Sequence, residues 1–395
     1  MNARERICAY ADAQEAIYRQ IALDIHARPE VSNHEFYACE RLSEQLRAEG
    51  FTVKVDVAGH RTGFTGVYSA AKPGPVLVFL AEYDALAGLG HGCGHNLFGP
   101  TSLLAAAALK QAVDEAGGEV RVYGTPGEEG GENGSAKSSF VREGFFRDVD
   151  AALCVHPGDA HVVTTRMLAC APVDIEFWGR PSHAASAPEK GINALDALIL
   201  TYNGINALRQ HVTDDVRMHG IITNGGQAPN IVPEYAAGKF YLRAASAPGL
   251  ENVYRRVEKI VEGAAAMTGA KGRMQPSQNR VENVIPTPSF DAVYARELGG
   301  VGFALQPPDS KIGIGSSDVG NVSQVVPTIQ PTICITDGPT PWHSEASKAA
   351  ACSEKGLASI VLGAKCLALT ALDLIEDPAL LDAIRREHAA MVAAQ

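Results

Sequence analysis

The sequence predicts a mixed α/β sheet flanked by helices, with a smaller α+β domain inserted into it. Apolar runs typical of buried strands, such as Val76 to Ala81 and Ala151 to Val155, alternate with helical segments early in the chain. From about Ala171 the order becomes strand, helix, two strands and helix, which is typical of split βαβ, ferredoxin-like units. A chain of 395 residues is also too long for one ordinary core, so two domains are expected.

The elements of the first domain follow from side-chain spacing. Ile17, Ile21 and Ile25 recur at helical spacing in a helix that is expected to end near Arg28-Pro29. The elements expected after it are a helix from Glu35 to Glu49, a half-buried strand from Phe51 to Val57, the strand at Val76, a helix from Thr101 to Ala112, a strand from Val120 to Tyr123 and the strand at Ala151.

In the inserted domain, Val173 to Trp178 alternates as a strand. The elements expected after it are a helix from Asn193 to Gln210, strands at His219 to Thr223 and Tyr235 to Arg243, and a helix from Leu250 to Met267. The chain is expected to re-enter the first domain near Val284 and to be helical from Leu357 to the end. The expected division is therefore residues 1–171 and 285–395 for one domain and 172–284 for the other.

Composition excludes several classes of protein. A formal charge of -11 and the absence of any Lys/Arg cluster argue against a nucleic-acid partner. No stretch approaches the roughly 18 to 20 uninterrupted apolar residues of a membrane span, and no apolar signal segment is expected at the N-terminus. A cytoplasmic protein is therefore expected. The eight cysteines form no paired framework, and most of them lie in apolar runs as small buried hydrophobic residues.

Metal-binding residue types recur in loops that follow the predicted strands. Cys93 and His95 lie two apart in a glycine-rich run, Glu128-Glu129 follows a second strand, His156 ends a third, and His343 comes near the C-terminus. A catalytic metal site needs ligands, an open position and a nearby base, whereas a structural zinc site needs only ligands. The spare carboxylate of the Glu pair therefore indicates a metal-dependent hydrolase.

Each of these residues alone also has an ordinary interpretation. Cys93 could be a buried thiol, although its Gly and His neighbours are poor packing residues, and an isolated Glu-Glu pair is usually a solvated surface. His156 alone is typical of a capped core histidine, and His343 alone of a loop histidine. The metal interpretation depends on finding all of them in one chain.

The chain resembles the aminoacylase and carboxypeptidase G family of metallopeptidases. The closest resemblance is to the amidohydrolase branch that acts on indoleacetyl-amino acids, hippurate and p-aminobenzoyl-glutamate. The resemblance extends over nearly the whole chain, and its motifs are AEYDAL (81–86), GHGCGHN (90–96), PGEEGG, His156-Pro157, GRPSHAASAPEKGINALDA (179–197), GGQAPNIVP (225–233), Ser317-Asp318 and PWHSEAS.

The resemblance implies a catalytic α/β domain and an inserted lid domain through which subunits dimerise. It implies one or two divalent ions, Mn²⁺ or Zn²⁺, with the ligands Cys93, His95, Glu129, His156 and His343. Glu128 would be the general base, and His183 would reach across the dimer interface to polarise the scissile carbonyl. Asn230 and Arg243 would bind the substrate, with the guanidinium of Arg243 on its carboxylate.

The chain departs from other branches of the family at one position. Those branches place a histidine two residues before the aspartate that corresponds to Asp84, whereas this chain has Glu82 there. Cys93 is a candidate for the missing ligand, and the roles of Glu82 and Asp84 stay open.

The expected reaction is hydrolysis of an amide bond in a small N-acyl amino acid, which can carry an aromatic acyl group, or in a dipeptide. The alternative reaction is release of ammonia from an arylamine acid of the aminobenzoate type by the same site. A non-catalytic binding protein on this scaffold is disfavoured because the base and all the ligand types are present. A structural-zinc protein is disfavoured because the ligands lie far apart in the sequence.

Overall fold

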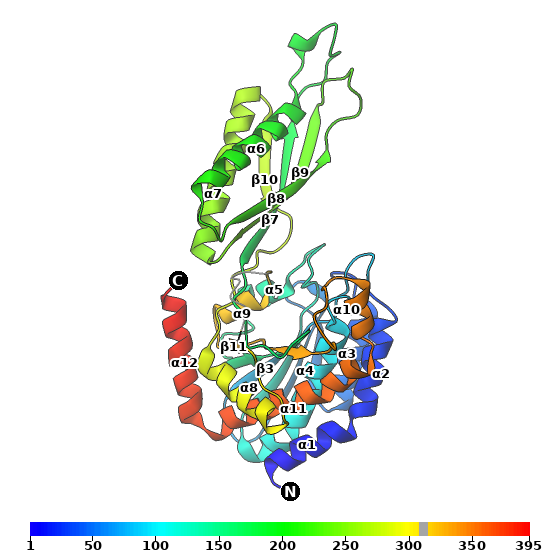
Figure 1. Cartoon of the computed structure of the whole chain (residues 1–395), viewed down its shortest axis with the longest axis vertical. Helices are drawn as coiled ribbons and strands as arrows, with labels where there is room; N and C mark the ends of the chain where they lie inside the picture. Colours follow the sequence, from blue (N-terminus) through cyan, green and yellow to red (C-terminus); the bar gives the residue numbers. More distant parts are fainter. Residues whose placement is uncertain (308–314) are drawn as a thin grey trace. The chain divides into compact units, whose positions relative to one another are not determined.

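The computed structural model describes residues 1–307 and 315–395, which form two compact units (Figure 1). The first unit comprises Met1–Arg166, Asp318–Ala394 and the segment that begins at Val284, and the second consists mainly of Met167–Asn283. Each unit has its own cluster of buried apolar side chains.

The first unit is built on a mixed sheet of six strands in the order β1-β2-β4-β3-β5-β11. The pairs of β3 with β4 and β5, and of β5 with β11, are parallel, whereas β2 is antiparallel to both of its neighbours. The strands are β1 (Thr52–Val57), β2 (His60–Ser69), β3 (Val76–Ala81), β4 (Glu119–Gly124), β5 (Ala151–Leu153) and β11 (Thr328–Ile329). A separate parallel pair joins β6 (His156–Gly158) to β12 (Thr332–Cys334). The predicted fold class is confirmed.

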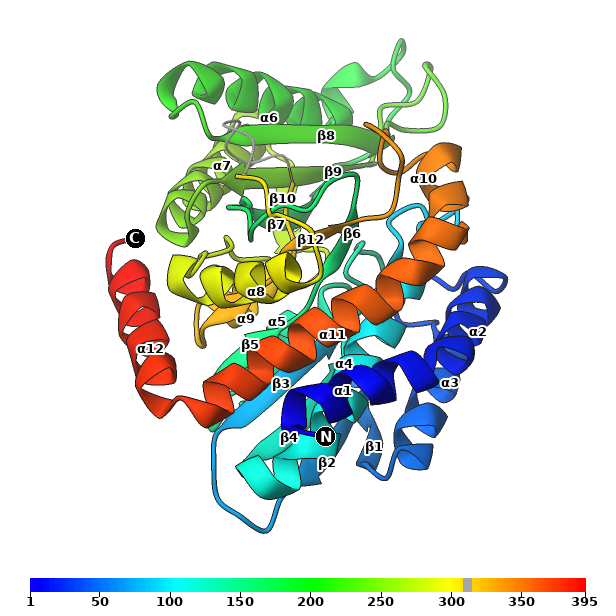
Figure 2. The same ribbon diagram turned by 60° about the horizontal axis from the view of Figure 1, so that its bottom comes forward.

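The helices of the first unit pack on this sheet or on other helices that contact it (Figure 2). They are α1 (Ala3–Ala13), α2 (Glu15–His26), α3 (Phe36–Ala48), α4 (His95–Ala116), α5 (Ala136–Arg142), α8 (Pro288–Gly300), α9 (Val319–Ser323), α10 (Glu345–Ala350), α11 (Glu354–Glu376) and α12 (Pro378–Ala393). Helices α4 and α11 lie against each other, and most of their side chains are buried. These two helices form the centre of the core.

Helix α11 is long and apolar but is interrupted by Lys365 and Asp373, in agreement with the expectation of no uninterrupted apolar stretch of membrane-spanning length. Among the described residues it is the one helix with the necessary length and hydropathy, and 78% of the relevant window is buried inside the protein. Its small and apolar side chains, Ala, Gly, Leu and Ile, pack against α4 and so account for the composition.

The second unit is an antiparallel sheet of four strands in the order β10-β7-β9-β8, with α6 and α7 packed against it. Its elements are β7 (Ala169–Trp178), the short 3₁₀ turn η1 (Pro188–Lys190), α6 (Ala194–Leu208), η2 (Arg209–His211), β8 (Arg217–Asn224), β9 (Tyr235–Ala244), α7 (Ala247–Thr268) and β10 (Lys271–Pro276). Strand β8 lies at the edge, and most of its side chains are exposed.

Several details differ from the sequence-based expectation. The first helix is two helices that meet at Gln14, and the C-terminal helix is interrupted at Asp377, before Pro378. Proline has no backbone N–H to continue the α11 ladder, but it suits the first turn of a new helix. Helix α4 begins at His95 rather than Thr101, so Pro100 lies inside the helix, where it removes one backbone hydrogen bond. Strands β2 and β10 were not predicted, because glycines and charged side chains interrupt their apolar alternation.

Candidate metal centre

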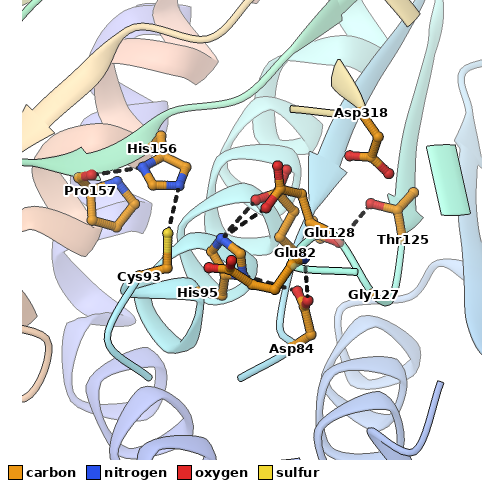
Figure 3. A network of polar contacts seen from close by, with 12 residues as sticks. Glu82, Asp84, Cys93, His95, Thr125, Gly127, Glu128, His156, Pro157 and Asp318 are labelled. Atoms are coloured by element: carbon orange, nitrogen blue, oxygen red, sulfur yellow. Dashed lines mark hydrogen bonds and ion pairs between the residues drawn. The ribbon is translucent and has the colours of Figure 1, made fainter. Parts of the chain in front are cut away.

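The candidate ligands come from loops at one edge of the sheet. Strands β3 and β4 run parallel, so their carboxyl ends meet at the same edge; Glu82 and Asp84 follow β3, and Glu128 and Glu129 follow β4. His156 follows β5, which is parallel to β3. Figure 3 shows the side chains of Glu82, Asp84, Glu128 and His156 gathered around Cys93 and His95.

Cys93 and His95 flank a glycine that the local geometry requires. Gly94 has φ +81, and a Cβ atom there would lie 2.9 Å from the ring of Pro157. A side chain at this position would therefore push the turn away from β6. With glycine, the Sγ atom of Cys93 lies 3.5 Å from Nε2 of His156, and α4 begins at His95 itself.

Hydrogen bonds orient two of the imidazole rings. Nδ1 of His156 lies 2.7 Å from the carbonyl oxygen of Pro157, so that nitrogen donates and carries the proton. Nδ1 of His95 lies 2.9 Å from Oδ1 of Asp84. A carbonyl or carboxylate partner on Nδ1 fixes the ring and leaves Nε2 free to bind an ion. Both imidazole rings are therefore in the tautomer that leaves Nε2 free to bind a metal ion.

Glu129 and His343 are the two remaining candidate ligands, and they contact each other. Nε2 of His343 lies 3.4 Å from Oε1 of Glu129, and the backbone N–H of Glu129 donates to Oδ2 of Asp84 over 2.9 Å. His343 has φ +57, a left-handed conformation that is uncommon for a residue other than glycine. Its side chain is half exposed (52%), so this end of the cluster is open to solvent.

The donor atoms are close enough to share ions. Their atoms lie within 4.8 Å of one another in three sets: Cys93 with His95 and His156, Cys93 with Glu129 and His343, and Glu82 with His95 and Glu128. Nε2 of His95 is buried and makes no hydrogen bond to the described residues; the nearest carboxylate oxygen is Oε2 of Glu82, at 3.1 Å. Thiol, imidazole and carboxylate donors suit Zn²⁺, and the carboxylates also suit Mn²⁺. The residues therefore fit a centre with one or two divalent ions.

The two adjacent glutamates have opposite electrostatic environments. Burial, followed by the nearby carboxylates of Glu82 and Glu129, raises the pKa of Glu128 well above its ordinary value. For Glu129 burial also acts upward, but the hydrogen bond to His343 and the charge of His95 outweigh it and lower the pKa to about 2. Paired groups whose pKa values are driven apart are typical of acid–base sites.

The structure also brings three further residues to the cluster. Glu82 lies 3.1 Å from Nε2 of His95, and Lys137 of α5 lies between Glu82 and Asp318. Asp318 belongs to one of the family motifs but has no predicted role, and nothing in the sequence indicates Lys137. No spacing rule marks a lone lysine in a loop-to-helix segment as buried, so only the fold shows it.

The residues that are predicted to contact the substrate lie in the second unit. His183 is exposed, and its Nδ1 accepts hydrogen bonds from the backbone N–H groups of Ala185 and Ser186, which leaves Nε2 as the donor. Asn230 is exposed. Arg243 at the end of β9 donates to Ser316, and no carboxylate among the described residues pairs with it.

Known proteins resemble the chain over most of its length. Residues 170–268 match a peptidase dimerisation domain of the M20 type. The chain is 35% identical to the Xaa-Arg dipeptidase of Mus musculus, over 98% of this chain and 91% of that protein. It is 33% identical to a p-aminobenzoyl-glutamate hydrolase polypeptide of Escherichia coli, over 95% of this chain and 93% of that one.

Solved structures share the fold. An aminobenzoyl-glutamate utilization protein from Klebsiella pneumoniae matches with a TM-score of 0.69 and 21% identity, over 90% of this chain and 97% of that one. A dinuclear metal-binding peptidase of the M20 family from Bacillus subtilis matches with a TM-score of 0.63 and 19% identity, over 92% and 99% of the two chains.

Proposed function

The chain belongs to the M20 family of peptidases, and on that basis we propose that it hydrolyses the amide bond of a small N-acyl amino acid or dipeptide. Membership of the family implies a metal-dependent amidohydrolase. We propose in addition which substrate the protein takes, which residue is the base and which residues bind the metal. The observation that supports it most directly is geometric: Glu128 lies beside the candidate metal donors, with its Oε2 4.0 Å from Nε2 of His95.

We propose that Cys93, His95, Glu129, His156 and His343 hold the metal. When bound, divalent ions supply Lewis-acid polarisation of the carbonyl and activation of water. Glu128 would accept the proton from the attacking water and return it to the leaving nitrogen, acting first as general base and then as general acid.

The second unit would supply the remaining polar contacts. Nε2 of His183 carries its proton, because Nδ1 accepts two backbone hydrogen bonds, so it can donate to the oxyanion of the tetrahedral intermediate. Arg243 has no carboxylate partner among the described residues and can take the substrate carboxylate in a bidentate pair. Asn230 would add a polar contact to the substrate.

The relatives guide the choice of substrate. The mouse relative is named for Xaa-Arg dipeptides, and the bacterial relative for p-aminobenzoyl-glutamate. Both kinds of molecule have an amide bond next to a residue with a free carboxylate. We propose the same general shape for the substrate of this chain, an acyl or aminoacyl group joined to an amino acid with a free carboxylate.

We further propose a homodimer formed through the second unit. Strand β8 is an edge strand, so it leaves a row of backbone groups unpaired, and its Ile221 and Ile222 side chains are 62% and 44% exposed. An exposed apolar edge of this kind pairs readily with a second strand. The match to a dimerisation domain over residues 170–268 supports this arrangement.

A metal-reconstituted activity screen tests the proposed reaction. Metal-free protein would be loaded with Mn²⁺ or Zn²⁺ and given N-acyl amino acids, Xaa-Arg dipeptides, p-aminobenzoyl-glutamate and aminobenzoates, with amino acid and ammonia measured separately. Metal-dependent release of an amino acid supports amide hydrolysis. Ammonia from an aminobenzoate alone would replace it with the arylamine reaction, and no product from any substrate would contradict both.

A further inference from the structure

A lysine side chain is completely buried beside the metal centre. Lys137 has no exposed surface; its Nζ atom lies 2.8 Å from Oε1 of Glu82 and 2.6 Å from Oδ1 of Asp318. Its backbone N–H also donates to Oδ2 of Asp318 over 3.0 Å. A buried ammonium requires such partners because it has lost its hydration. The three side chains therefore form a fixed Asp–Lys–Glu triad (Figure 3 shows Glu82 and Asp318).

The triad leaves one oxygen of Glu82 directed at the candidate ligands. Oε2 of Glu82 lies 3.1 Å from Nε2 of His95, and Oε2 of Glu128 lies 4.0 Å from the same nitrogen. Two ligands with bonds of about 2.1 Å to one ion lie roughly 3 Å apart. The Glu82 oxygen therefore already has the separation from His95 that two ligands of one ion require.

Charge balance also favours a cation at this place. Lys137 has two carboxylate partners where one would neutralise it, so the triad has a net negative charge while all three side chains are fully buried. Glu128 lies beside it. Oε1 of Glu82 is paired with the ammonium of Lys137, so a cation near Oε2 would offset the negative charge that remains buried.

We propose that Glu82 is an additional metal ligand, shared with His95, and that Lys137 and Asp318 are positioning residues that hold its carboxylate toward the ion. The proposal rests on the metal site of the proposed function and assigns residues for which that function has no role. A structural ion pair would need only the Lys137–Asp318 contact. The second contact, to Glu82, links the pair to the donor cluster.

Metal binding tests the ligand role without any assay of turnover. E82Q keeps the size of the side chain, and Lys137 keeps Asp318 as its partner, so the variant is expected to fold. Its affinity for Mn²⁺ or Zn²⁺, measured by calorimetric titration of metal-free protein, should fall by about tenfold or more, as when a ligand or its support is lost. In the Co²⁺-loaded protein the visible absorption should change, because the coordination changes.

E297Q is the matched control for that experiment. Glu297 is a buried carboxylate of α8 in the same unit, ion-paired with Arg4, and belongs to none of the three donor sets. It should bind metal as the wild type does. Wild-type metal affinity together with an unchanged Co²⁺ spectrum in E82Q would overturn the ligand role.

The double variant K137M/D318N separates positioning from simple charge compensation. It removes one positive and one negative charge together, so its thermal stability should be closer to that of the wild type than the stability of K137M alone. If Lys137 positions Glu82, metal affinity should still fall by about 10- to 100-fold. Wild-type affinity in a folded double variant would show that the triad serves stability only and would overturn the positioning role.

These outcomes can be distinguished from failure of the proposed function. A wild-type protein that binds metal but releases no product from any substrate contradicts the proposed reaction. The metal titrations of E82Q and K137M/D318N still test whether Glu82 binds the metal and whether Lys137 and Asp318 position it.

Discussion

The Sγ atom of Cys93 lies 3.5 Å from Nε2 of His156, although α4, β4, α5 and β5 lie between the two residues in the chain. His156 donates from Nδ1 to the backbone of the next residue, so the nitrogen that faces the thiol is the one able to bind metal. Burial raises the pKa of the Cys93 thiol well above its ordinary value. A coordinated ion reverses that effect, since a thiol ligand loses its proton outright.

The C93S variant should change which metal the protein prefers. Thiolate favours Zn²⁺ over Mn²⁺, so the Zn²⁺ affinity should fall by about tenfold or more while the Mn²⁺ affinity changes less. Competition titrations of the two ions measure the ratio. C352S, a half-buried cysteine outside the donor sets, is the control and should keep the wild-type ratio. An unchanged ratio in C93S would exclude Cys93 as a ligand.

The E128Q variant should separate metal binding from turnover. Loss of a general base typically lowers kcat by about 10²- to 10⁴-fold, while KM and metal content should stay near the wild-type values because Glu128 is not proposed as a ligand. Elemental analysis and steady-state kinetics with the substrate found in the screen measure both. E132Q changes an exposed carboxylate (79%) close by in the chain and should leave kcat unaltered. Near-normal turnover in E128Q would contradict the proposed role.

Mixing two inactive variants tests whether His183 acts on the opposite protomer of the dimer. H183Q alone should lose roughly 100- to 1,000-fold in kcat, the usual cost of losing an oxyanion donor. If each site combines Glu128 of one protomer with His183 of the other, mixed dimers of E128Q and H183Q contain one intact site. Random mixing should then restore about a quarter of wild-type activity in a two-fold symmetric dimer. No recovery after exchange of protomers would place His183 in the site of its own chain.

Part of the fold and of the candidate site could be predicted from the sequence because these parts have local sequence patterns. The strands β3 and β5 are continuous apolar runs, and the Gly-His-Gly-Cys-Gly-His run and the Glu pair are loop motifs directly after strands. The structure brings Cys93, His95, Glu129, His156 and His343 into one cluster. The positions of Cys93, Glu129 and His156 after strands favoured this proximity, whereas His343 alone is typical of a loop histidine, and the role of all five as ligands stays a prediction.

The rest depends on burial and long-range contacts, which one sequence does not show. Lys137 and Asp318 are 181 positions apart, and neither has a neighbour that indicates a buried ion pair. Strand β2 contains Gly63 and Gly66, and in the fold a Cβ atom on Gly66 would lie 2.9 Å from Leu46, so the glycine that interrupts the pattern is a packing requirement. Strand β10 has Lys271, Gly272 and Arg273 in succession, with both charged side chains exposed, and so lacks an apolar signal.

A charge on the edge strand should disrupt the proposed dimer. I221K places an ammonium on β8 where the side chain is 62% exposed, so the fold of the unit should tolerate it while strand pairing between protomers is disfavoured. Light scattering after size exclusion should show a shift from dimer to monomer. M267K, at an equally exposed apolar position (69%) on α7, should leave the dimer intact. A wild-type dimer in I221K would mean that another surface forms the interface.

The carboxyl group of Glu35 should make the stability of the metal-free protein fall as the pH rises. Its Oε1 accepts from the backbone N–H of Gly127, directly before the Glu pair, and its Oε2 accepts from Thr62. Burial, followed by the charge of Asp84, raises its pKa from 4.5 to about 8. Between these two values the folded state holds a proton that the unfolded state has released. The contribution of Glu35 to the free energy of unfolding therefore decreases across this interval.

The E35Q variant removes that decrease, because an amide stays neutral and can still accept from Gly127. Urea unfolding of metal-free wild type and E35Q from about pH 5 to pH 9 measures the difference, and the variant should gain stability relative to the wild type as the pH rises. E132Q, on an exposed carboxylate, should give a curve parallel to the wild type. Parallel curves for E35Q as well would mean that Glu35 is already ionised in the folded protein, and that its hydrogen bonds to Gly127 and Thr62 outweigh the cost of burial.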